Sequence, residues 1–569
     1  MSEKSLHEFH GAILLLLMGE ILCRDESARK WKCSLQKWGR GMELKKCNIH
    51  MNKVKCRSNL QITLDEDNNV PDTKADIRHI IREQGNVRVT EKKMSNGKLF
   101  VKGVLEYTVL YLSEGGEHQI ESLCGEIPFD EIIHMEEGCS GDTVCLRADL
   151  EELEVSMIHS RKIAVRSLLQ LFVTVEELYD EEAAIGMEEE ANVYMRSKRI
   201  PVTTIALNQK DTSRLKEELV LPAGKSNMEE MLYWELDLKS AEARVSNDQV
   251  AVKGELLLFL LYQGGNNMEG RRGSELEFYE TTIPFQTSYT ISVRGDDLVD
   301  DISFMLNNEN VSIKQDEDGE ARLLEVEAVL EADLKLYEEK ELEILTDVYA
   351  TNQVVTPVRK EAQYENLLLK NASRMRMTER VALGEKSIGT MLQICHGNAG
   401  VKIDECRTVQ DGLELEGALE VKLLYISEED EKPLQSLHTL IPFTHRIEVK
   451  GMNEHTIYDL KPIVADTMFS MFRTDEVEVK ADVVFTLLAM ERKREEMIEA
   501  LHCRPFEEEE IDAMPGILGY RVQHGDSLWE IAKRYYTTVP EIMQMNELVS
   551  EEVKVGDKLL LLKQMVSIL

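Results

Sequence analysis

Apolar and polar residues alternate over long stretches of the chain, and this period of two predicts β-strands. In residues 413–425, LELEGALEVKLLY, apolar side chains recur at about every second position with charged ones between them. Such a pattern is typical of a strand with one buried and one exposed face. Alternating segments also occupy 99–114, 162–175, 250–265, 324–337 and 476–490. The pattern predicts a mainly β protein.

Three of these segments belong to a unit that recurs along the chain. They read LFVKGVLEYTVLYLSE (99–114), VAVKGELLLFLLYQGG (250–265) and LELEGALEVKLLYISE (413–428). Each places a glycine and a tyrosine at the same spacing, and an Ile-Pro-Phe triplet follows each one. The signature residues are Gly103, Tyr111 and Pro128, then Gly254, Tyr262 and Pro284, then Gly417, Tyr425 and Pro442. Because three of the 12 prolines fall in this one triplet, we interpret the pattern as three tandem β domains.

The residues of the unit carry further expectations. The glycine suits a bulge or a close backbone approach, and the proline, which lacks a ladder donor, belongs at a strand start or edge. The second copy is apolar on both faces, which predicts a more buried strand. A short helical pattern precedes each glycine strand, at 72–85, 228–236 and 388–397, and predicts one short helix per unit.

The C-terminal segment 519–562 follows a different pattern. After a turn at Gly525, the residues Leu528, Ile531 and Ala532 recur at helical spacing and predict one buried helix face. Asp526 or Ser527 is expected to cap that helix. The predicted order is a strand from Tyr520, a helix from Leu528, a helix from Pro540 to about Asn546, and a strand from Lys558 to Leu562, which is βααβ.

Length and charge limit the possible functions. A chain of 569 residues is long enough for roughly three to five domains. Its formal net charge of −38 argues against a nucleic-acid-binding surface, which needs clustered Lys and Arg. It favours a basic protein partner or a well-solvated surface. The ten cysteines show no CxxC spacing and indicate reduced thiols.

The first 41 residues do not fit the rest of the chain. The apolar run Ala12–Met18 is too short for a membrane span, and no cleavage site follows it. Trp38–Gly41 stands directly before Met42, and its codons are compatible with a purine-rich ribosome-binding site. We therefore hypothesise that translation starts at Met42. Detection of residues 1–41 in the native protein by N-terminal mass analysis would refute this.

The repeats resemble a known domain. The first copy carries NNVPDTKADIRHII (68–81), with Pro71-Asp72 and Asp76-Ile77. With the glycine strand and the Ile-Pro-Phe triplet, this motif resembles the SPOCS domain of spore-coat and morphogenetic proteins in endospore-forming Firmicutes. The second and third copies lack the Pro-Asp signature and resemble the domain through the strand and triplet alone. Residues 519–562 are similar to LysM, and several SPOCS-like units followed by one LysM is the layout of SipL-like spore coat morphogenetic proteins.

The repeats and this resemblance predict the domain boundaries. We expect boundaries between repeats in Glu-rich stretches such as 176–192. The predicted parts are a non-native leader at 1–41, SPOCS-like repeats at 45–180, 195–345 and 360–500, an acidic linker at 504–518 and a LysM domain at 519–565.

The LysM resemblance implies candidate binding residues. In wall-binding LysM domains, N-acetylglucosamine chains lie between two loops, and the matching positions here are Gly525, Asp526, Ser527, Leu528, Met545, Asn546, Glu547 and Leu548. The alternative is that these residues only build the fold, as a cap, a core leucine and a helix stop. In SipL-like proteins the resemblance implies docking onto the ATPase of the coat basement layer. Trp529 follows Leu528 off the apolar face, so we expect an exposed interface anchor.

Motifs for chemistry were not found. The sequence contains no GxxxxGK[ST], HExxH or GxSxG run. Asp65-x-Asp67-x-Asn69 departs from a calcium loop at its sixth and twelfth positions, Val70 and Asp76. We therefore predict no catalytic residue, no metal and no cofactor.

The repeats, the absence of catalytic motifs and the resemblance to SipL-like proteins together predict a non-enzymatic scaffold of the spore coat. It would anchor coat layers to the forespore through protein docking, with the coat-basement ATPase as partner, in the mother-cell cytoplasm at the forespore surface. We expect no nucleic-acid partner and no membrane span. The alternative is a peptidoglycan-binding protein of the cell wall or spore cortex that recognises N-acetylglucosamine glycan. A third possibility combines the two, with the LysM towards the cortex and the repeats towards the coat.

Overall fold

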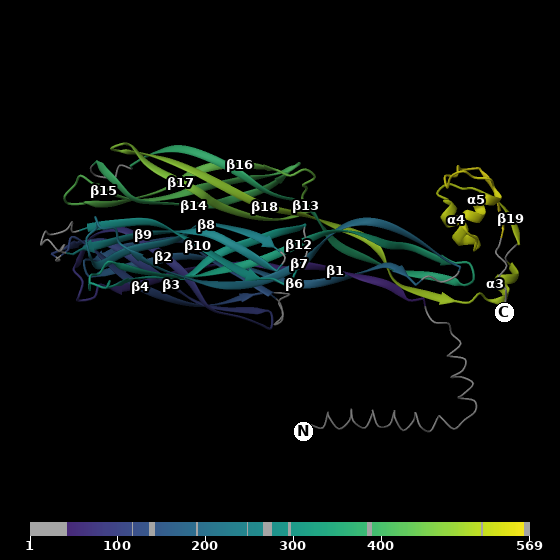
Figure 1. Ribbon diagram of the computed structural model, residues 1–569, viewed down its shortest axis with the longest axis horizontal. Coiled ribbons are helices and arrows are strands. Elements are labelled where there is room, and N and C mark those ends of the chain that lie inside the picture. The colour runs from purple at the N-terminus through teal and green to yellow at the C-terminus, as the bar shows by residue number, and fades with distance from the viewer. Residues whose placement is uncertain are drawn as a thin grey trace, which may run out of the picture.

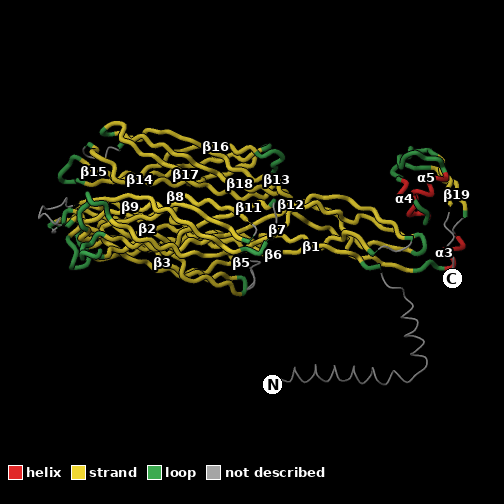
Figure 2. Tube along the Cα trace, in the orientation of Figure 1, coloured by secondary structure: helices red, strands yellow, loops and turns green. Residues whose placement is uncertain are grey.

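The computed structural model describes residues 42–562, except for 116–117, 136–142, 189–191, 247, 266–275, 294–296, 384–389 and 514–515. Residues 1–41 lie outside this range, so the expected start at Met42 stays a prediction. The described chain is almost entirely β-strand, and its helices lie at the C-terminal end (Figure 2). The predicted mainly β fold is confirmed.

The described part of each repeat contains six strands. Repeat 1 has β1 (Leu44–Asn69), β2 (Asp76–Ser95), β3 (Lys98–Glu114), β4 (Ile120–His134), β5 (Thr143–His159) and β6 (Lys162–Met187). Repeat 2 has β7 (Val193–Val220), β8 (Met228–Ser246), β9 (Gln249–Gly264), β10 (Leu276–Thr290), β11 (Leu298–Lys314) and β12 (Leu323–Ala350). Repeat 3 has β13 (Val354–Ala382), β14 (Met391–Val409), β15 (Gly412–Ser427), β16 (Leu434–Glu448), β17 (Thr456–Arg473) and β18 (Glu476–Arg504).

The strands of a repeat form two antiparallel sheets. In repeat 1 the short sheet has the order β2-β3-β4 and the long sheet the order β1-β6-β5. The same orders recur in repeat 2 as β8-β9-β10 and β7-β12-β11, and in repeat 3 as β14-β15-β16 and β13-β18-β17. The two sheets enclose an apolar core, to which β3 contributes Leu105 and Val109 and β6 contributes Leu169 and Val173.

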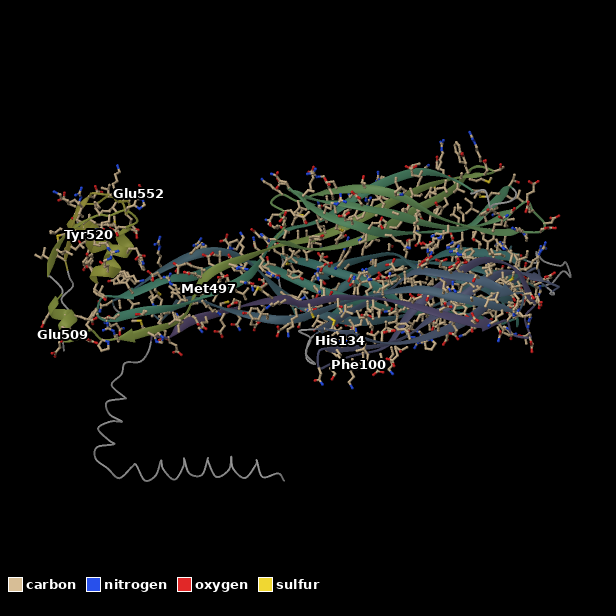
Figure 3. The ribbon with its side chains drawn as sticks, turned by 180° about the vertical axis from the view of Figure 1, so that it is seen from behind. Phe100, His134, Met497, Glu509, Tyr520 and Glu552 are labelled. Carbon is tan, nitrogen blue, oxygen red and sulfur yellow. The ribbon has the colours of Figure 1, made fainter. Side chains whose placement is uncertain are left out.

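The long sheets continue beyond these sandwiches and form a stem. In Figure 1 the sandwiches make up a head, and the pairs β1/β6, β7/β12 and β13/β18 run from it towards the C-terminal helices. Met497 lies on this stem (Figure 3). The buried stem core consists of Ile49, Met51, Ala183, Ile200, Val202, Ile344, Ala362, Tyr364 and Met497.

The stem accounts for the Glu-rich stretch 176–192. Most of it is the last part of β6, which pairs with β1 and ends at Met187, and β7 begins at Val193. The strands β6, β12 and β18 therefore run past the ends expected for the repeats, at 180, 345 and 500. The predicted domain boundaries stay predictions.

The short helices predicted in the repeats are wrong. Residues 76–85 and 228–236 belong to β2 and β8, and β14 begins at Met391 within the third predicted helix. Each strand has register shifts near its start, such as those at Ile77/His79 and Ile80/Arg82 in β2. A β-bulge inserts one residue and moves the following side chains to the other face. Two bulges close together give apolar residues a helix-like spacing.

The glycine and the Ile-Pro-Phe triplet are cross-strand partners. Gly103 lies opposite Phe129, and a Cβ at this glycine would be 2.3 Å from Phe129 Cζ. Gly254 and Gly417 face Phe285 and Phe443 in the same way. The close approach expected for the glycine is confirmed, and it explains the constant spacing.

The triplet prolines lie on edge strands, and the signature tyrosines lie on the central strands. The prolines lie in β4, β10 and β16, each of which pairs with one neighbour, so the expected edge position is confirmed. The Tyr111 hydroxyl donates to Glu121 Oε2 at 3.1 Å, and the Tyr262 hydroxyl donates to Glu277 Oε2 at 3.0 Å. The Tyr425 hydroxyl lies 3.4 Å from Gln435 Oε1.

The three short sheets meet in the head at a buried cluster that we call the head junction. Its apolar members are Ile81, Leu110, Leu112, Ile120, Leu232, Tyr233, Phe259, Leu261, Cys395, Leu424 and Leu434. Phe259 and Leu261 come from β9, and Leu110 and Leu112 come from β3 in the same way. The prediction that the second glycine strand is more buried than the others is wrong, because β15 has more buried residues than β9. Tyr233 of this cluster stands at the position that Arg82 holds in repeat 1 and His396 holds in repeat 3, so each repeat brings one polar group to the junction.

Candidate binding site on the C-terminal module

The C-terminal module has the predicted βααβ order. It consists of β19 (Ile517–Arg521), α4 (Leu528–Tyr535), α5 (Val539–Met545) and β20 (Lys558–Leu562), after a short helix α3 (Glu508–Ala513) in the acidic segment. Leu528, Ile531 and Ala532 of α4 are buried against Ile542 of α5, which confirms the expected apolar face.

The first loop of the expected groove is held by its own side chains. Gly525 has φ +89°, a conformation that favours glycine. Asp526 Oδ2 accepts hydrogen bonds from the Tyr520 hydroxyl at 2.6 Å and from the Gln523 amide at 2.8 Å. These bonds lower the pKa of Asp526. Ser527 is the cap of α4, because its side chain accepts from the Glu530 amide at 3.2 Å.

The second loop is anchored by Asn546. Its side chain accepts from the Leu560 amide at 2.7 Å and donates to the carbonyls of Leu560 and Ile542 at 2.9 and 2.8 Å. Leu548 packs on the module core, whereas Met545 and Glu547 are exposed.

The candidate residues therefore divide into two groups. Asp526, Ser527, Leu528, Asn546 and Leu548 make contacts that build the fold. Gly525 on the first loop, Met545 at the end of α5 and Glu547 on the second loop remain exposed. Binding by any of these residues stays a prediction.

Trp529 contacts the stem of the same chain. Its Nε1 donates to Asp347 Oδ2 of β12 at 2.7 Å, and Lys533 Nζ lies 2.6 Å from Asp347 Oδ1. The indole meets the ring of Tyr349 edge-on at 4.9 Å between centroids. The Tyr349 hydroxyl donates to the Thr537 carbonyl at 3.0 Å. Together these bonds hold α4 against the end of the stem in repeat 2, as Figure 1 shows.

Asp347 is the centre of this contact. Burial would raise the pKa of its carboxyl, but hydrogen bonds from Lys533 and Trp529 outweigh that effect and hold the pKa below its usual value. The Asp347 side chain is only 8% exposed, so removal of either donor leaves a poorly solvated charge.

The exposed position expected for Trp529 is thus corrected. The indole is half-buried because the chain itself supplies an acceptor and a ring for it. Asp347 lies 182 residues away in the sequence, and no local pattern pairs the two. A contact of Trp529 with another protein stays a prediction.

Sequence reasoning also missed two arginines that shape the repeats. The guanidinium of Arg161 donates to the carbonyls of Lys74 and Pro71 at 2.6 and 2.9 Å. Arg322 of repeat 2 binds the carbonyls of Lys225 and Pro222 in the same way. Repeat 2 therefore retains the proline turn of repeat 1 without its Pro-Asp signature. In the sequence, an arginine directly before the strands β6 and β12 was the signal that could have identified this shared turn.

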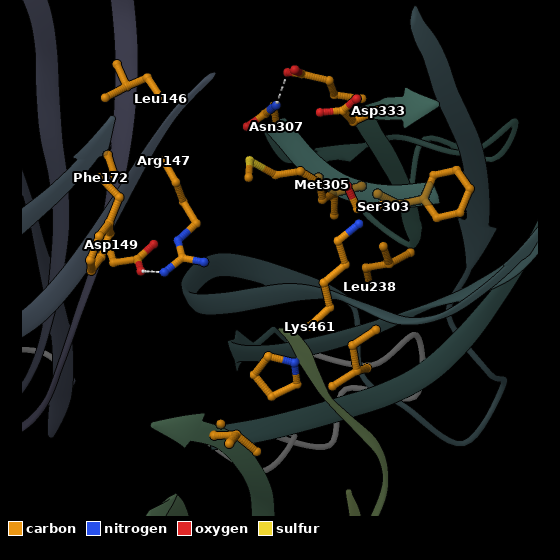
Figure 4. Close-up of a pocket in the computed structure, with 18 of the residues that line it drawn as sticks. Leu146, Arg147, Asp149, Phe172, Leu238, Ser303, Met305, Asn307, Asp333 and Lys461 are labelled. Carbon is orange, nitrogen blue, oxygen red and sulfur yellow. Dashed lines mark hydrogen bonds and ion pairs between the residues drawn. The ribbon is translucent and has the colours of Figure 1, made fainter. Parts of the chain in front are cut away.

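A cavity in the head is a second candidate site. It has a volume of about 1920 Å³ and lies between side chains of all three repeats (Figure 4). Its charged groups pair locally: Arg147 with Asp149 at 2.9 Å, and Lys461 with Asp301. Lysines, arginines and carboxylates line the cavity together, so it presents charges of both signs to a ligand. No three metal-binding side chains come together within the described residues.

Comparisons with protein families agree with this architecture. The SipL SPOCS domain model matches residues 76–158 and 390–472, which are β2–β5 of repeat 1 and β14–β17 of repeat 3. The LysM domain model matches residues 520–561. Neither the curated proteins nor the solved structures gave a significant match. The chain thus contains two SipL-type SPOCS domains and a C-terminal LysM domain, and repeat 2 shares their sheet orders.

The matched SPOCS model is that of the SipL family, which implies a spore-coat context for these two domains. Both matched domain types are binding domains, and the matches include no catalytic family. No helix among the described residues has the length and apolar character needed to cross a membrane.

Proposed function

We propose that this protein is a non-enzymatic scaffold that anchors coat layers to the forespore. Its LysM domain docks onto the ATPase of the coat basement, and its SPOCS repeats contact other coat proteins, in the mother-cell cytoplasm at the forespore surface. The SPOCS and LysM matches support this proposal.

The observation that carries the proposal is the position of the LysM domain. The domain is attached through α4 to the end of the stem, and the exposed Gly525 and Glu547 lie on its two loops, with Met545 at the end of α5. An arm of paired strands separates it from the three sandwiches (Figure 1). A docking domain at one end and broad sheet faces at the other suit a protein that joins two layers.

The test is binding of the full chain to the purified ATPase. We expect Met545→Arg to weaken binding at least about tenfold, which corresponds to about 1.4 kcal/mol. Glu509→Arg on α3, which is labelled in Figure 3, is the matched surface control and should bind like the wild type. Failure of the wild-type chain to bind would contradict the proposal.

Peptidoglycan binding is the second candidate function. The exposed Gly525, Met545 and Glu547, at the two loops that hold N-acetylglucosamine in wall-binding LysM domains, favour it. Co-sedimentation of the full chain with purified cortex peptidoglycan, competed by chitin oligomers, tests it. Sedimentation without ATPase binding would favour this function over docking, and binding to both would support a LysM that serves both ligands.

The proposed location has its own test. A fluorescent fusion is expected to form a shell around the forespore inside the mother cell. Signal on the outer surface of the mother cell would contradict a cytoplasmic scaffold.

A further inference from the structure

The long sheet of repeat 3 has an exposed face on which cations and apolar side chains gather. We call it the basic face and define it by Arg376, Arg380, Met468, Phe472, Arg473 and Lys480. The side chains of Arg376 and Arg380 are 76% and 56% exposed, and Met468 is 58% exposed. Glu478 and Asp482 of the central strand β18 are largely covered. Asp466 of β17 is exposed on the same face, but the cations outnumber it, so the accessible charge of this face is positive, on a chain of net charge −38.

The composition of the basic face is that of a protein interface. The guanidinium of Arg380 lies 3.7 Å from the ring centroid of Phe472, across β18. Arginine, methionine and aromatic residues are enriched at the centres of interfaces, where they supply most of the binding energy.

The equivalent face of repeat 1 has the opposite charge. We call it the acidic face and define it by Asp65, Asp67, Glu152, Glu154, Met157 and Ile158. The sheet registers place Asp67 where repeat 3 has Arg380, and Glu154 where it has Met468. All six residues are exposed. Lys162 and Arg166 pair with Asp67 and Asp65, so the four carboxylates outnumber the cations on this face.

The two faces also share an apolar corner. Met157 and Ile158 end β5 at the positions that Met471 and Phe472 occupy in β17. Ile158 is 50% exposed and Phe472 is 41% exposed. Both faces therefore combine an apolar corner with charges that are complementary between the two repeats.

We propose that the basic face of repeat 3 binds the acidic face of repeat 1 in a second copy of this chain. The apolar corners pack together, and Arg376 and Arg380 meet the carboxylates of the acidic face. Pairing of two acidic faces would instead oppose like charges, which disfavours that arrangement.

The contact joins two different surfaces, so each copy keeps one unused face of each kind after binding. Repeat 1 and repeat 3 lie on opposite sides of the head in the view of Figure 1. A heterologous contact of this type extends into a chain of copies unless its rotation closes a ring. This assembly is independent of the ligand of the LysM domain.

The test is analytical ultracentrifugation of the full chain between about 1 and 100 µM. Two variants each remove one face: Arg376→Ala/Arg380→Ala/Met468→Ser, and Asp67→Ala/Glu154→Ala/Ile158→Ser. We expect the wild type to form oligomers of increasing size and each variant alone to remain monomeric. An equimolar mixture of the two variants retains one working pair of faces, and we expect it to stop at dimers.

The control uses the same position in repeat 2. Glu218 occupies the sheet row of Asp67 and Arg380 and is exposed, so Glu218→Ala should assemble like the wild type. Equal thermal unfolding of all variants shows that their folds are intact. A wild type that stays monomeric over the whole range would overturn the proposal. So would loss of assembly only on change of repeat 3, which would mean that the basic face pairs with itself.

Discussion

In the stem, the three repeats meet through apolar side chains such as Ile49, Ile344 and Tyr364, whereas at the head junction they also meet through Arg82, Glu235 and His396. Both regions are buried, and both draw residues from all three repeats. Their chemistry is different. Apolar contacts are non-directional and tolerate exchange of similar side chains. A buried ion pair stabilises only the arrangement that brings its partners together.

Glu235 of repeat 2 links the other two repeats at the junction. Its Oε2 lies 3.1 Å from Arg82 Nη2 of repeat 1 and 3.3 Å from His396 Nε2 of repeat 3. The amide of Asn398 donates to its Oε1 at 2.6 Å. Burial would raise the pKa of Glu235, but the hydrogen bond to His396 and the charge of Arg82 outweigh it, so the pKa is lowered.

Arg82, Tyr233 and His396 stand at equivalent positions of the three repeats, so the junction can distinguish one repeat from another. The three repeats carry an arginine, a tyrosine and a histidine at this position, and their observed order places the arginine and the histidine beside Glu235. In the stem, the apolar cluster dominates the contact between repeats, and the buried Glu181 of repeat 1 adds an ion pair with Lys360 of repeat 3 at 2.5 Å. The junction gathers Arg82, His396 and Asn398 around the one buried carboxylate of Glu235. We therefore expect the stem to contribute mainly general stability and the junction to contribute more to determining which repeat lies where.

The largest expected effect is that of Glu235→Ala. The change leaves Arg82 and His396 buried without their common carboxylate, and a broken buried pair typically costs about 3–5 kcal/mol. Chemical denaturation of the full chain at pH 7 should show this loss.

The matched control for that change is Glu255→Ala on the neighbouring strand β9. Glu255 pairs with Lys239 at 3.2 Å, and its side chain is 45% exposed. Its loss should cost under about 1 kcal/mol, because exposed pairs contribute little. Equal losses for the two variants would contradict the special role of the junction.

Within a repeat, the sequence contains enough information to predict the sheets. Alternation identifies the long strands, and the spacing from Gly103 to Phe129 encodes a real cross-strand contact. The helix predicted at 72–85 failed because the bulges at Ile77 and Ile80 disturb the period of two. Local patterns are reliable where the ladder is regular, and they mislead where it is interrupted.

Contacts between repeats could not be predicted from local patterns. Arg82 and Glu235 are 153 residues apart, and nothing local distinguishes them from the many exposed ions of this acidic chain. The contact of Trp529 with Asp347 could not be predicted either. The helical pattern showed that Trp529 lies off the apolar face, but it did not indicate a partner. Contacts between domains depend on shapes that form only after each domain has folded.

The stem is expected to respond to loss of volume. Ile344→Ala removes a fully buried side chain from the stem core and should cost about 2–4 kcal/mol, because the cavity is only partly refilled. The loss should be nearly the same at pH 5.5 and pH 8, since the apolar cluster around Ile344 contains no carboxylate, lysine, arginine or histidine. Leu178→Ala is the control, because Leu178 is 61% exposed on β6 and its loss should be nearly neutral. A pH-dependent loss for Ile344→Ala would show that the stem core is energetically coupled to a titrating group.

The junction, in contrast, should be sensitive to pH. Burial and the nearby charge of Glu235 raise the pKa of Asp237 to about 7. Burial would lower the pKa of His396, but contacts with Glu235 and Glu280 outweigh it and raise the pKa. Both groups therefore bind protons more tightly in the folded chain than in the unfolded chain. Stability from such groups is complete below their unfolded pKa values and is lost as the pH rises through the folded ones.

The smallest of these effects is a gain in stability from Asp237→Asn. The amide cannot ionise, so the variant avoids the charge that the wild type develops beside Glu235 as the pH rises towards 8. Between pH 5 and pH 8 the wild type should lose on the order of 2 kcal/mol more than the variant. Denaturation midpoints of both proteins across this range measure the difference. Because Asp237 lies at the junction and not in the stem, parallel curves for the two proteins would place the pH sensitivity elsewhere in the molecule.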